Sequence, residues 1–280
     1  MPPQPRRPSA TRGRARGVLS LAAIVDEAMR IIDREGIDEV SMRRIAGEFD
    51  TGPASLYAYV ANKDELLTHC LRRVVSETPM PRGETWPEVL RSWAVGTRNT
   101  LAAHGDIARL SFGVIPEGDG FIEIMERILG AMQSAGVPAR VATWGVDVLS
   151  LYVAADAYEG WIMGRIFEDG SGRSTEEVGQ EYFREFGERL AALPPERYPA
   201  IASNLWSMMS GGGDERFAFG VDIFIAGIAA QIPADLGPPA RVPAAQIPAT
   251  QGKSGDRQPP AKRSKRVSAA GNTPARGRRG

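Results

Sequence analysis

The stretch from Ser41 to Leu67 reads SMRRIAGEFDTGPASLYAYVANKDELL and holds three successive helix start signals. Ser41 can cap a first short helix, because its hydroxyl can accept a hydrogen bond from a backbone N–H of the first turn. Pro53 suits the first turn of a second helix, where its missing N–H costs nothing. Asn62, followed three residues later by Glu65, is typical of the start of a third. Two short helices joined by a tight turn and followed by a longer one predict a helix-turn-helix.

The second short helix, about Pro53 to Tyr59, has the composition of a helix that reads DNA. Its first residues are small, which lets the N-terminus of the helix approach base edges in the major groove. We therefore expect four residues to lie at base edges: Pro53, Ala54, Ser55 and Ala58. We expect five residues to hold the DNA backbone: Ser41, Arg43, Tyr57, Tyr59 and Lys63. The alternative for the two tyrosines is a half-buried place in the hydrophobic core.

The whole stretch closely resembles the DNA-binding region of the tetracycline-repressor (TetR) family of bacterial transcription regulators. The resemblance is carried by Ser41-Met42-Arg43-x-Ile45-Ala46 and by Leu56-Tyr57-x-Tyr59-Val60-x-Asn62-Lys63-x-x-Leu66-Leu67. It covers residues 20–76 best and continues more loosely to about residue 231. The resemblance implies an all-α protein with a three-helix DNA-binding head and a larger helical domain that binds a ligand and dimerises. It also implies that Arg43 reaches a base.

Prolines and composition divide the chain into parts. A first helix starts after Ser20 and runs to about Glu35, and Pro79 and Pro81 end the segment that holds the helix-turn-helix. We predict four parts: a disordered basic arm (residues 1–19), a helix-turn-helix DNA-binding domain (20–78), a helical effector-binding and dimerisation domain (84–231) and a disordered basic tail (236–280).

The net charge of zero hides a segregation of charge along the chain. Residues 1–19 carry five arginines and no acid, and residues 236–280 carry ten basic residues and one acid. The part between them carries 19 basic and 33 acidic residues, so it would repel DNA in bulk. Arg-Gly-Arg segments such as Arg12-Gly13-Arg14 can lie in a narrow minor groove, so we expect the arm to contact DNA. The tail either contacts DNA as well or only keeps the protein soluble.

From Trp86 to about Gln231 the pattern is helical throughout, with no convincing alternating strand. We predict helices near 85–103, 106–112, 120–135, 138–168, 175–192, 198–209 and 214–230. The helix from Pro138 to Glu168 carries two apolar stripes and must be buried on two sides. Together with the last helix, where we expect Phe224 at the interface, it can form a four-helix bundle between two subunits. The resemblance implies the same homodimer; the alternative is a monomer with one fully internal helix.

Large apolar side chains and a few polar ones in the second domain have the composition of a small-molecule pocket between helices. The expected pocket residues are Trp93, Asn99, His104, Phe112, Trp144, Asp147 and Tyr152. The same residue types also build an ordinary helical core, so the residues alone decide neither way. The resemblance implies an effector pocket here. A metal-bound tetracycline is not favoured, because no histidine–carboxylate constellation stands out.

No pattern for catalysis, metal binding or a cofactor stands out. His69 and His104 are the only histidines and have no HExxH spacing, and there is no glycine-rich phosphate loop after a strand. Cys70 is the single cysteine and is expected to be a buried thiol. With no apolar run near the ~20 residues of a membrane span and no secretory signal, we expect a cytoplasmic protein without a membrane partner.

We therefore predict a non-enzymatic, ligand-responsive transcriptional regulator without metal or cofactor. It is expected to act as a repressor that binds a double-stranded, palindromic DNA operator as a homodimer and is released by a small hydrophobic effector. The alternative is a helical module that binds protein rather than a specific DNA sequence. A steep salt dependence of binding would favour DNA, because phosphate contacts release counterions.

Overall fold

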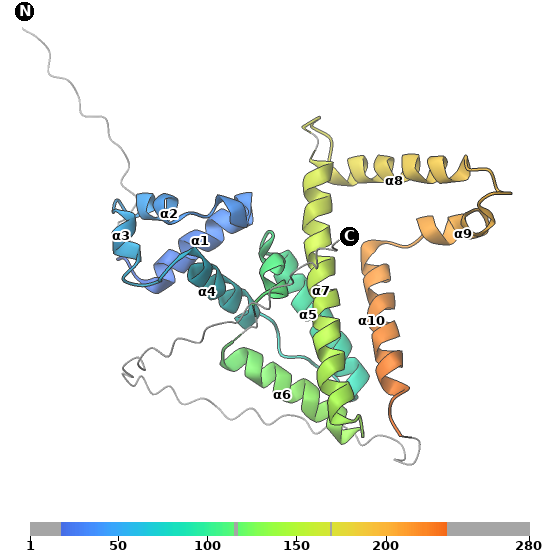
Figure 1. Cartoon of the computed structure of the whole chain (residues 1–280), viewed down its shortest axis with the longest axis horizontal. Coiled ribbons are helices and arrows are strands. Elements are labelled where there is room, and N and C mark those ends of the chain that lie inside the picture. Colours follow the sequence, from blue (N-terminus) through green and yellow to red (C-terminus); the bar gives the residue numbers. More distant parts are fainter. Residues whose placement is uncertain (1–17, 115–116, 169, 234–280) are drawn as a thin grey trace, which may run out of the picture. The chain divides into compact units, whose positions relative to one another are not determined.

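The computed structural model describes residues 18–114, 117–168 and 170–233, and within these ranges every regular element is a helix (Figure 1). The predicted all-α fold is confirmed. The elements are α1 (Leu21–Glu35), η1 (Ile37–Glu39), α2 (Met42–Glu48), α3 (Pro53–Leu56), α4 (Lys63–Ser76), α5 (Trp86–Ala102), η2 (Ile107–Phe112), α6 (Asp119–Ser134), α7 (Ala139–Phe167), α8 (Thr175–Ala191), α9 (Pro199–Met209) and α10 (Gly213–Ala229). Residues of the predicted arm before Val18 and the predicted tail from residue 236 lie outside the described residues.

The helices of the head begin where their caps were predicted. The hydroxyl of Ser20 accepts a hydrogen bond from the Ala23 N–H at 3.2 Å. The hydroxyl of Ser41 accepts one from Arg44 at 3.2 Å, and the Asn62 side chain accepts one from the Glu65 N–H at 2.8 Å. Each bond satisfies a donor that has no partner within its own helix.

The second short helix is shorter than its sequence predicts. It ends at Leu56 rather than at Tyr59. Leu56 is fully buried, and its carbonyl accepts hydrogen bonds from the N–H groups of Tyr59 and Val60. The chain therefore turns around one buried leucine, and Tyr57 to Tyr59 lie on that turn.

Two hydrophobic cores organise the described residues. The first fills the head and includes Ile24, Ile45 and Leu71, all fully buried. It also takes in Leu101 at the end of α5 and Ile107 of η2, so the head packs on the larger domain through apolar contacts. The second core, which we call the body core, lies among α5, α6, α7 and α10.

One apolar face of α7 and α10 is left open to solvent in the single chain. Trp144 is 60% exposed on α7, and Phe219 and Ile223 are 67% and 56% exposed on α10. Large apolar side chains on adjacent helices form a surface of the kind that an oligomer buries. Phe224, expected at the interface, is half-buried in the single chain, with its ring centroid 5.5 Å from that of Tyr152.

Helices α8 and α9 contribute almost nothing to either core. Gly179 is the single buried residue of α8, and α9 has none. The two helices pack on each other, and α8 packs on α7. Within the described ranges, no helix is both long and apolar enough to cross a membrane.

Candidate functional site

The start of α3 is an open surface of small side chains. Pro53, Ala54 and Ala58 are exposed, as a role at base edges requires. Ser55 is half-buried, and its hydroxyl lies 2.8 Å from the hydroxyl of Thr51. The buried Leu56 packs this segment against the core of the head, and Tyr57 and Tyr59 after it remain at the surface.

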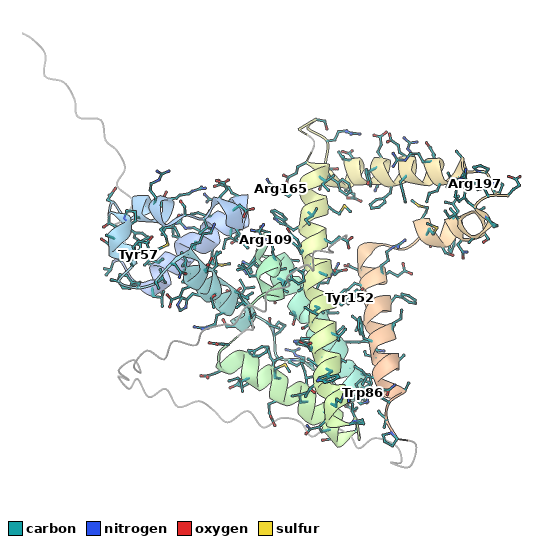
Figure 2. All side chains as sticks on the ribbon, viewed as in Figure 1. Tyr57, Trp86, Arg109, Tyr152, Arg165 and Arg197 are labelled. Carbon is teal, nitrogen blue, oxygen red and sulfur yellow. The ribbon has the colours of Figure 1, made fainter. Side chains whose placement is uncertain are left out.

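Three of the five residues expected to hold the DNA backbone already have hydrogen-bond partners: Ser41, which accepts from the Arg44 N–H, and Tyr59 and Lys63. Tyr57 is 52% exposed and lies at the surface of the head (Figure 2), which argues against a place in the core. The Tyr59 hydroxyl donates a hydrogen bond to the Leu19 carbonyl at 3.0 Å. The Lys63 ammonium donates one to the Ile37 carbonyl at 3.0 Å. Lysine has three donors, so Lys63 can still reach a phosphate, whereas the single hydroxyl proton of Tyr59 is occupied.

The head offers few cations to DNA. Residues 20–78 carry seven basic and eleven acidic side chains. Four of the seven form ion pairs with carboxylates: Arg30, Arg44, Arg72 and Arg73. Arg34, Arg43 and Lys63 have no ion pair within the described part of the chain. Arg43 is exposed on α2, the helix that packs against α3.

A cavity of about 510 Å³ lies between the end of α4 and the helices of the larger domain. Its lining residues come from α4, α5, η2, α6 and α7 and from the chain next to them: Val75, Thr78, Trp93, Thr97, Leu101, Ser111, Phe112, Gly113, Val114, Phe121, Ile124, Met125, Thr143, Val146, Asp147, Ser150, Leu151 and Ala154. Three of the expected pocket residues, Trp93, Phe112 and Asp147, line it. We call this space the effector cavity below.

The other four expected pocket residues lie elsewhere. Asn99 is exposed on α5, and Trp144 is exposed with the Arg140 guanidinium 4.0 Å from its ring centroid. Tyr152 faces α10 (Figure 2), and its ring stacks on that of Phe217 at 5.5 Å and 5°. Burial raises the pKa of the Tyr152 phenol. These residues were assigned to the pocket from composition, which does not say which face of a helix points inward.

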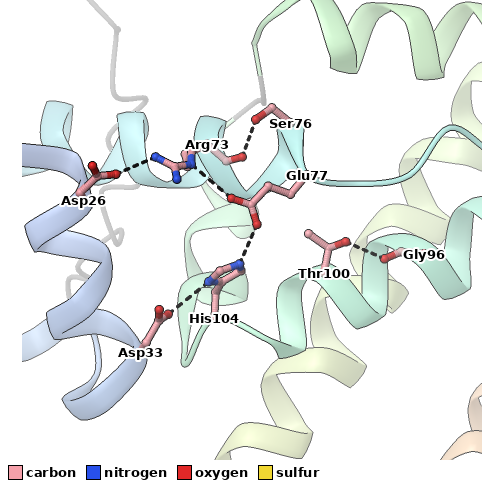
Figure 3. A network of polar contacts seen from close by, with 8 residues as sticks. All are labelled: Asp26, Asp33, Arg73, Ser76, Glu77, Gly96, Thr100 and His104. Atoms are coloured by element: carbon pink, nitrogen blue, oxygen red, sulfur yellow. Dashed lines mark hydrogen bonds and ion pairs between the residues drawn. The ribbon is translucent and has the colours of Figure 1, made fainter. Parts of the chain in front are cut away.

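His104 belongs to a polar joint between the head and the larger domain (Figure 3). Its Nδ1 lies 3.2 Å from the Asp33 carboxylate of α1, and its Nε2 lies 3.0 Å from the Glu77 carboxylate after α4. Glu77 also accepts a hydrogen bond from Arg73 at 3.2 Å. His104 therefore ties the end of α5 to two elements of the head and does not line the effector cavity.

The next residues along the chain extend this joint. The Asp106 carboxylate is 1% exposed and accepts a hydrogen bond from the Ile37 N–H at 2.8 Å. The Arg109 guanidinium donates to both oxygens of Asp38 at 3.1 and 2.8 Å. The hydrogen bond from Arg109 lowers the pKa of Asp38, and the same bond raises the pKa of Arg109. Gly105 has φ +56 and lies so close to the Ile32 carbonyl that any side chain would collide with it.

Thr97 is a lining residue that sequence reasoning missed. Its hydroxyl is buried and has no hydrogen-bond partner within the described residues, whereas a helical threonine commonly donates to the carbonyl four residues earlier. Thr100 does so to Gly96 at 2.9 Å (Figure 3), and Thr143 does so to Ala139 at 2.9 Å. The available signal was its spacing, four residues after Trp93 and four before Leu101.

The described residues show neither a metal site nor a reactive thiol. No group of three or more histidine, cysteine, aspartate or glutamate side chains in these ranges could hold a metal ion. Cys70 is fully buried, and burial raises the pKa of its thiol to about 12. A thiol so rarely ionised is a poor nucleophile.

Comparison with known proteins assigns both domains. The family described as "Bacterial regulatory proteins, tetR family" matches residues 24–70, across the helix-turn-helix. The family described as "Tetracyclin repressor-like, C-terminal domain" matches residues 78–232. The chain belongs to the tetR family. The resemblance inferred from residues 41–67 is thereby confirmed.

Several relatives are repressors. The transcriptional repressor DrrR1 of Streptomyces coeruleorubidus is 30% identical over 228 residues, covering 80% of this chain and 81% of DrrR1. The class D tetracycline repressor of Escherichia coli is 24% identical over 222 residues, covering 78% of this chain and 93% of the relative. ActR from Streptomyces coelicolor, solved in complex with actinorhodin, matches with a TM-score of 0.67 and 33% identity, covering 77% of this chain and 98% of ActR. This tetR-family chain is a ligand-responsive DNA-binding transcriptional regulator.

Proposed function

We propose that this protein is a repressor that binds a palindromic operator as a homodimer and releases it when a small apolar molecule enters the effector cavity. The observation that carries the proposal is the position of α4. Lys63 begins this helix beside the DNA-reading segment, and Val75 near its other end lines the effector cavity. A helix of 14 residues is about 21 Å long and stiff, so an occupant that moves Val75 also moves the head.

The relatives support the same cycle of binding and release. ActR was solved both without ligand and in complex with actinorhodin, and DrrR1 is a transcriptional repressor. The cavity volume of about 510 Å³ lies in the range of small-molecule sites. Enclosure by α5, η2, α6 and α7 gives such a molecule apolar contacts on several sides.

The open apolar face of α7 and α10 supports the homodimer. Phe219 and Ile223 lie one helical turn apart on α10, and Trp144 is exposed on α7. The same face on a second copy is complementary to it under two-fold symmetry. Two heads related by that symmetry would read two half-sites of a palindromic operator.

The N-terminal arm is proposed as a further DNA contact. Its arginines lie outside the described residues, but the chain that leads to them is held beside α3. The Leu19 carbonyl is bound by Tyr59, the Leu19 side chain packs on the core of the head, and Val18 is 86% exposed. Five arginines just before Val18 would supply positive charge that the acidic head lacks.

The decisive experiment selects DNA with the full-length protein from a randomised pool and then screens small molecules for release of the selected duplex. Sequence-specific binding with a steep salt dependence, lost on adding an active compound, is the expected result. Ser150→Trp, which fills the effector cavity, should still bind the duplex but no longer release it. Failure to enrich any sequence would favour a protein-binding module, and release from the filled variant would place the effector elsewhere.

A further inference from the structure

Thr97, in the wall of the effector cavity, carries a hydroxyl that the protein itself leaves unsatisfied within the described ranges. The Thr97 hydroxyl is buried and lacks a hydrogen-bond partner among residues 18–114, 117–168 and 170–233, although threonines on the same helix and on α7 bond to the carbonyl four residues earlier. Thr97 lies between Trp93 and Leu101 on one stripe of α5, and all three line the cavity. A buried hydroxyl without a partner, on a residue that lines a cavity, is a group that an occupant of the cavity can bind.

The lining of the effector cavity carries a negative charge and no positive one. Asp147 is the one charged side chain among the lining residues, and no lysine, arginine or histidine is among them. Its carboxylate has no hydrogen bond or ion pair with another described residue. Asp147 is exposed to solvent at the edge of the lining, and an anion bound in the cavity would lie beside its negative charge without gaining a cationic partner, which is unfavourable.

The walls provide aromatic surface on three sides. Trp93 comes from α5, Phe112 from η2 and Phe121 from α6. Trp93 is 6% exposed and therefore already held in place by its packing. Phe112 is 46% exposed and Phe121 is half-buried, so Trp93 is the fixed ring of the three. Aromatic walls of this kind favour a flat, aromatic occupant, which can stack on the rings or meet them edge-on.

We propose that the effector is an aromatic molecule without an anionic group, which presents one hydrogen-bonding nitrogen or oxygen to Thr97. This inference rests on the proposed function of the cavity and adds the chemical class of the ligand. Thr97 acts as the residue that recognises the polar atom, because its hydroxyl can either donate or accept. Asp147 acts as the residue that excludes anions.

Three probes of similar shape test the proposal on the full-length chain. N-phenyl-1-naphthylamine has an N–H between its two ring systems, and 1-benzylnaphthalene has a CH₂ in that place. 8-Anilino-1-naphthalenesulfonate adds a sulfonate to the first skeleton. The affinities of N-phenyl-1-naphthylamine and of the sulfonate are measured by fluorescence titration. The affinity of 1-benzylnaphthalene is measured by its displacement of N-phenyl-1-naphthylamine.

The parent should bind N-phenyl-1-naphthylamine about three- to tenfold more tightly than 1-benzylnaphthalene, the value of one hydrogen bond. Thr97→Val should remove this preference, and Thr100→Val, the matched change on the same helix outside the cavity, should keep it. The sulfonate should bind at least about tenfold more weakly than the neutral amine. Asp147→Asn should reduce the difference in affinity between the neutral amine and the sulfonate, whereas Glu123→Gln on the exposed side of α6 should leave this difference unchanged. Because Ser150→Trp fills the cavity, the fluorescence that a probe still shows with this variant comes from binding to other surfaces.

Three results would overturn the proposal. They are a preference for the amine that survives Thr97→Val, equal binding of the sulfonate and the neutral amine by the parent, and no cavity-dependent binding of any probe. The same protein samples are tested for binding to the selected duplex. Retained DNA binding in a sample that fails the probe test rejects the ligand class alone, whereas loss of DNA binding by the parent rejects the proposed function.

Discussion

The head and the effector cavity differ in how their residues are gathered. The nine residues predicted to contact DNA lie within residues 41–63, a continuous stretch held in shape by its own caps and by one buried leucine. The cavity draws its lining from five helices that are spread between Val75 and Ala154. A surface built from local structure can be read from spacing, whereas an enclosed space depends on how distant helices face one another. The two regions meet along α4 and at the joint around His104.

The largest expected effect comes from separating two subunits. Ile223→Asp places a charge on the open face of α10, where a partner would leave it buried and unpaired. We expect a monomer by sedimentation and a loss of operator affinity of about a thousandfold or more, because one head makes half of the contacts. Glu215→Gln, a change on the first turn of α10, is the control. A monomeric Ile223→Asp protein with full affinity would show that one head suffices.

The second prediction tests whether the head can be destabilised without loss of ligand binding in the cavity. Leu56→Ala removes a fully buried side chain around which the DNA-reading segment turns. We expect the free energy of unfolding of the head to fall by about 2–5 kcal/mol, with DNA binding lost in proportion. Fluorescence of N-phenyl-1-naphthylamine in the cavity should change little, since Leu56 does not line it. Equal loss of DNA binding and probe binding would mean that the head and the cavity unfold together.

The two regions also show how far sequence reasoning reaches. The caps at Ser20, Ser41 and Asn62 were predictable because each acts on a backbone N–H three residues away. Helix α3 proved shorter because the turn around Leu56 is set by tertiary burial, which no local signal encodes. Trp144, expected in the pocket, is exposed on α7, and Phe224, expected at the subunit interface, is half-buried against Tyr152, for a similar reason. On a helix with two apolar stripes, composition cannot tell which stripe faces the same chain and which stays open.

His104 and Thr97 also show that composition does not identify the residues of a pocket: His104 was expected there and lies elsewhere, whereas Thr97 lines the cavity and was not expected. His104 was expected in the pocket because it is a rare polar residue near apolar helices, yet it lies between the carboxylates of Asp33 and Glu77. The sequence does not single out Thr97, because a threonine within a helix usually bonds to a carbonyl of the preceding turn. The unpaired state of its hydroxyl is a property of the fold, seen among the described residues, and not of the local sequence.

The third prediction tests the open surface of the head. Lys63→Ala should weaken binding to all duplexes alike, by roughly tenfold, and reduce the salt slope by about one. Ser55→Ala should instead change which base is preferred, because the side chain lies at the start of α3. Affinities measured against the selected duplex and a scrambled one at several salt concentrations distinguish the two. If both variants bind as the parent does, this face does not contact DNA.

The fourth prediction concerns the clamp between Tyr59 and Leu19. Tyr59→Phe removes the donor that holds the Leu19 carbonyl and leaves the ring in place. If Tyr59 mainly aims the arm, the variant and a chain lacking residues 1–17 should each lose a few-fold in affinity, and the two changes together should lose no more than the deletion alone. Additive losses would instead mean that Tyr59 contacts phosphate itself, as the sequence first suggested.

The smallest expected effect tests the joint that links the two regions. Arg109 lowers the pKa of the Asp38 carboxyl below its usual value of 3.8, so Asp38 binds its proton less readily in the folded chain than in the unfolded one. The pairing therefore contributes stability above the unfolded pKa, and that contribution is lost as the pH falls through the lowered folded value. Asp38→Asn should be slightly less stable than the parent at pH 7, and the difference should vanish in acid. Denaturant unfolding of both proteins at pH 7, 5 and 3 measures it, with Glu123→Gln as the control. Since Asp38 is exposed, the difference at pH 7 should be small. A difference that persists unchanged at pH 3 would show that the asparagine acts through packing and that the ion pair does not hold η1 of the head to η2.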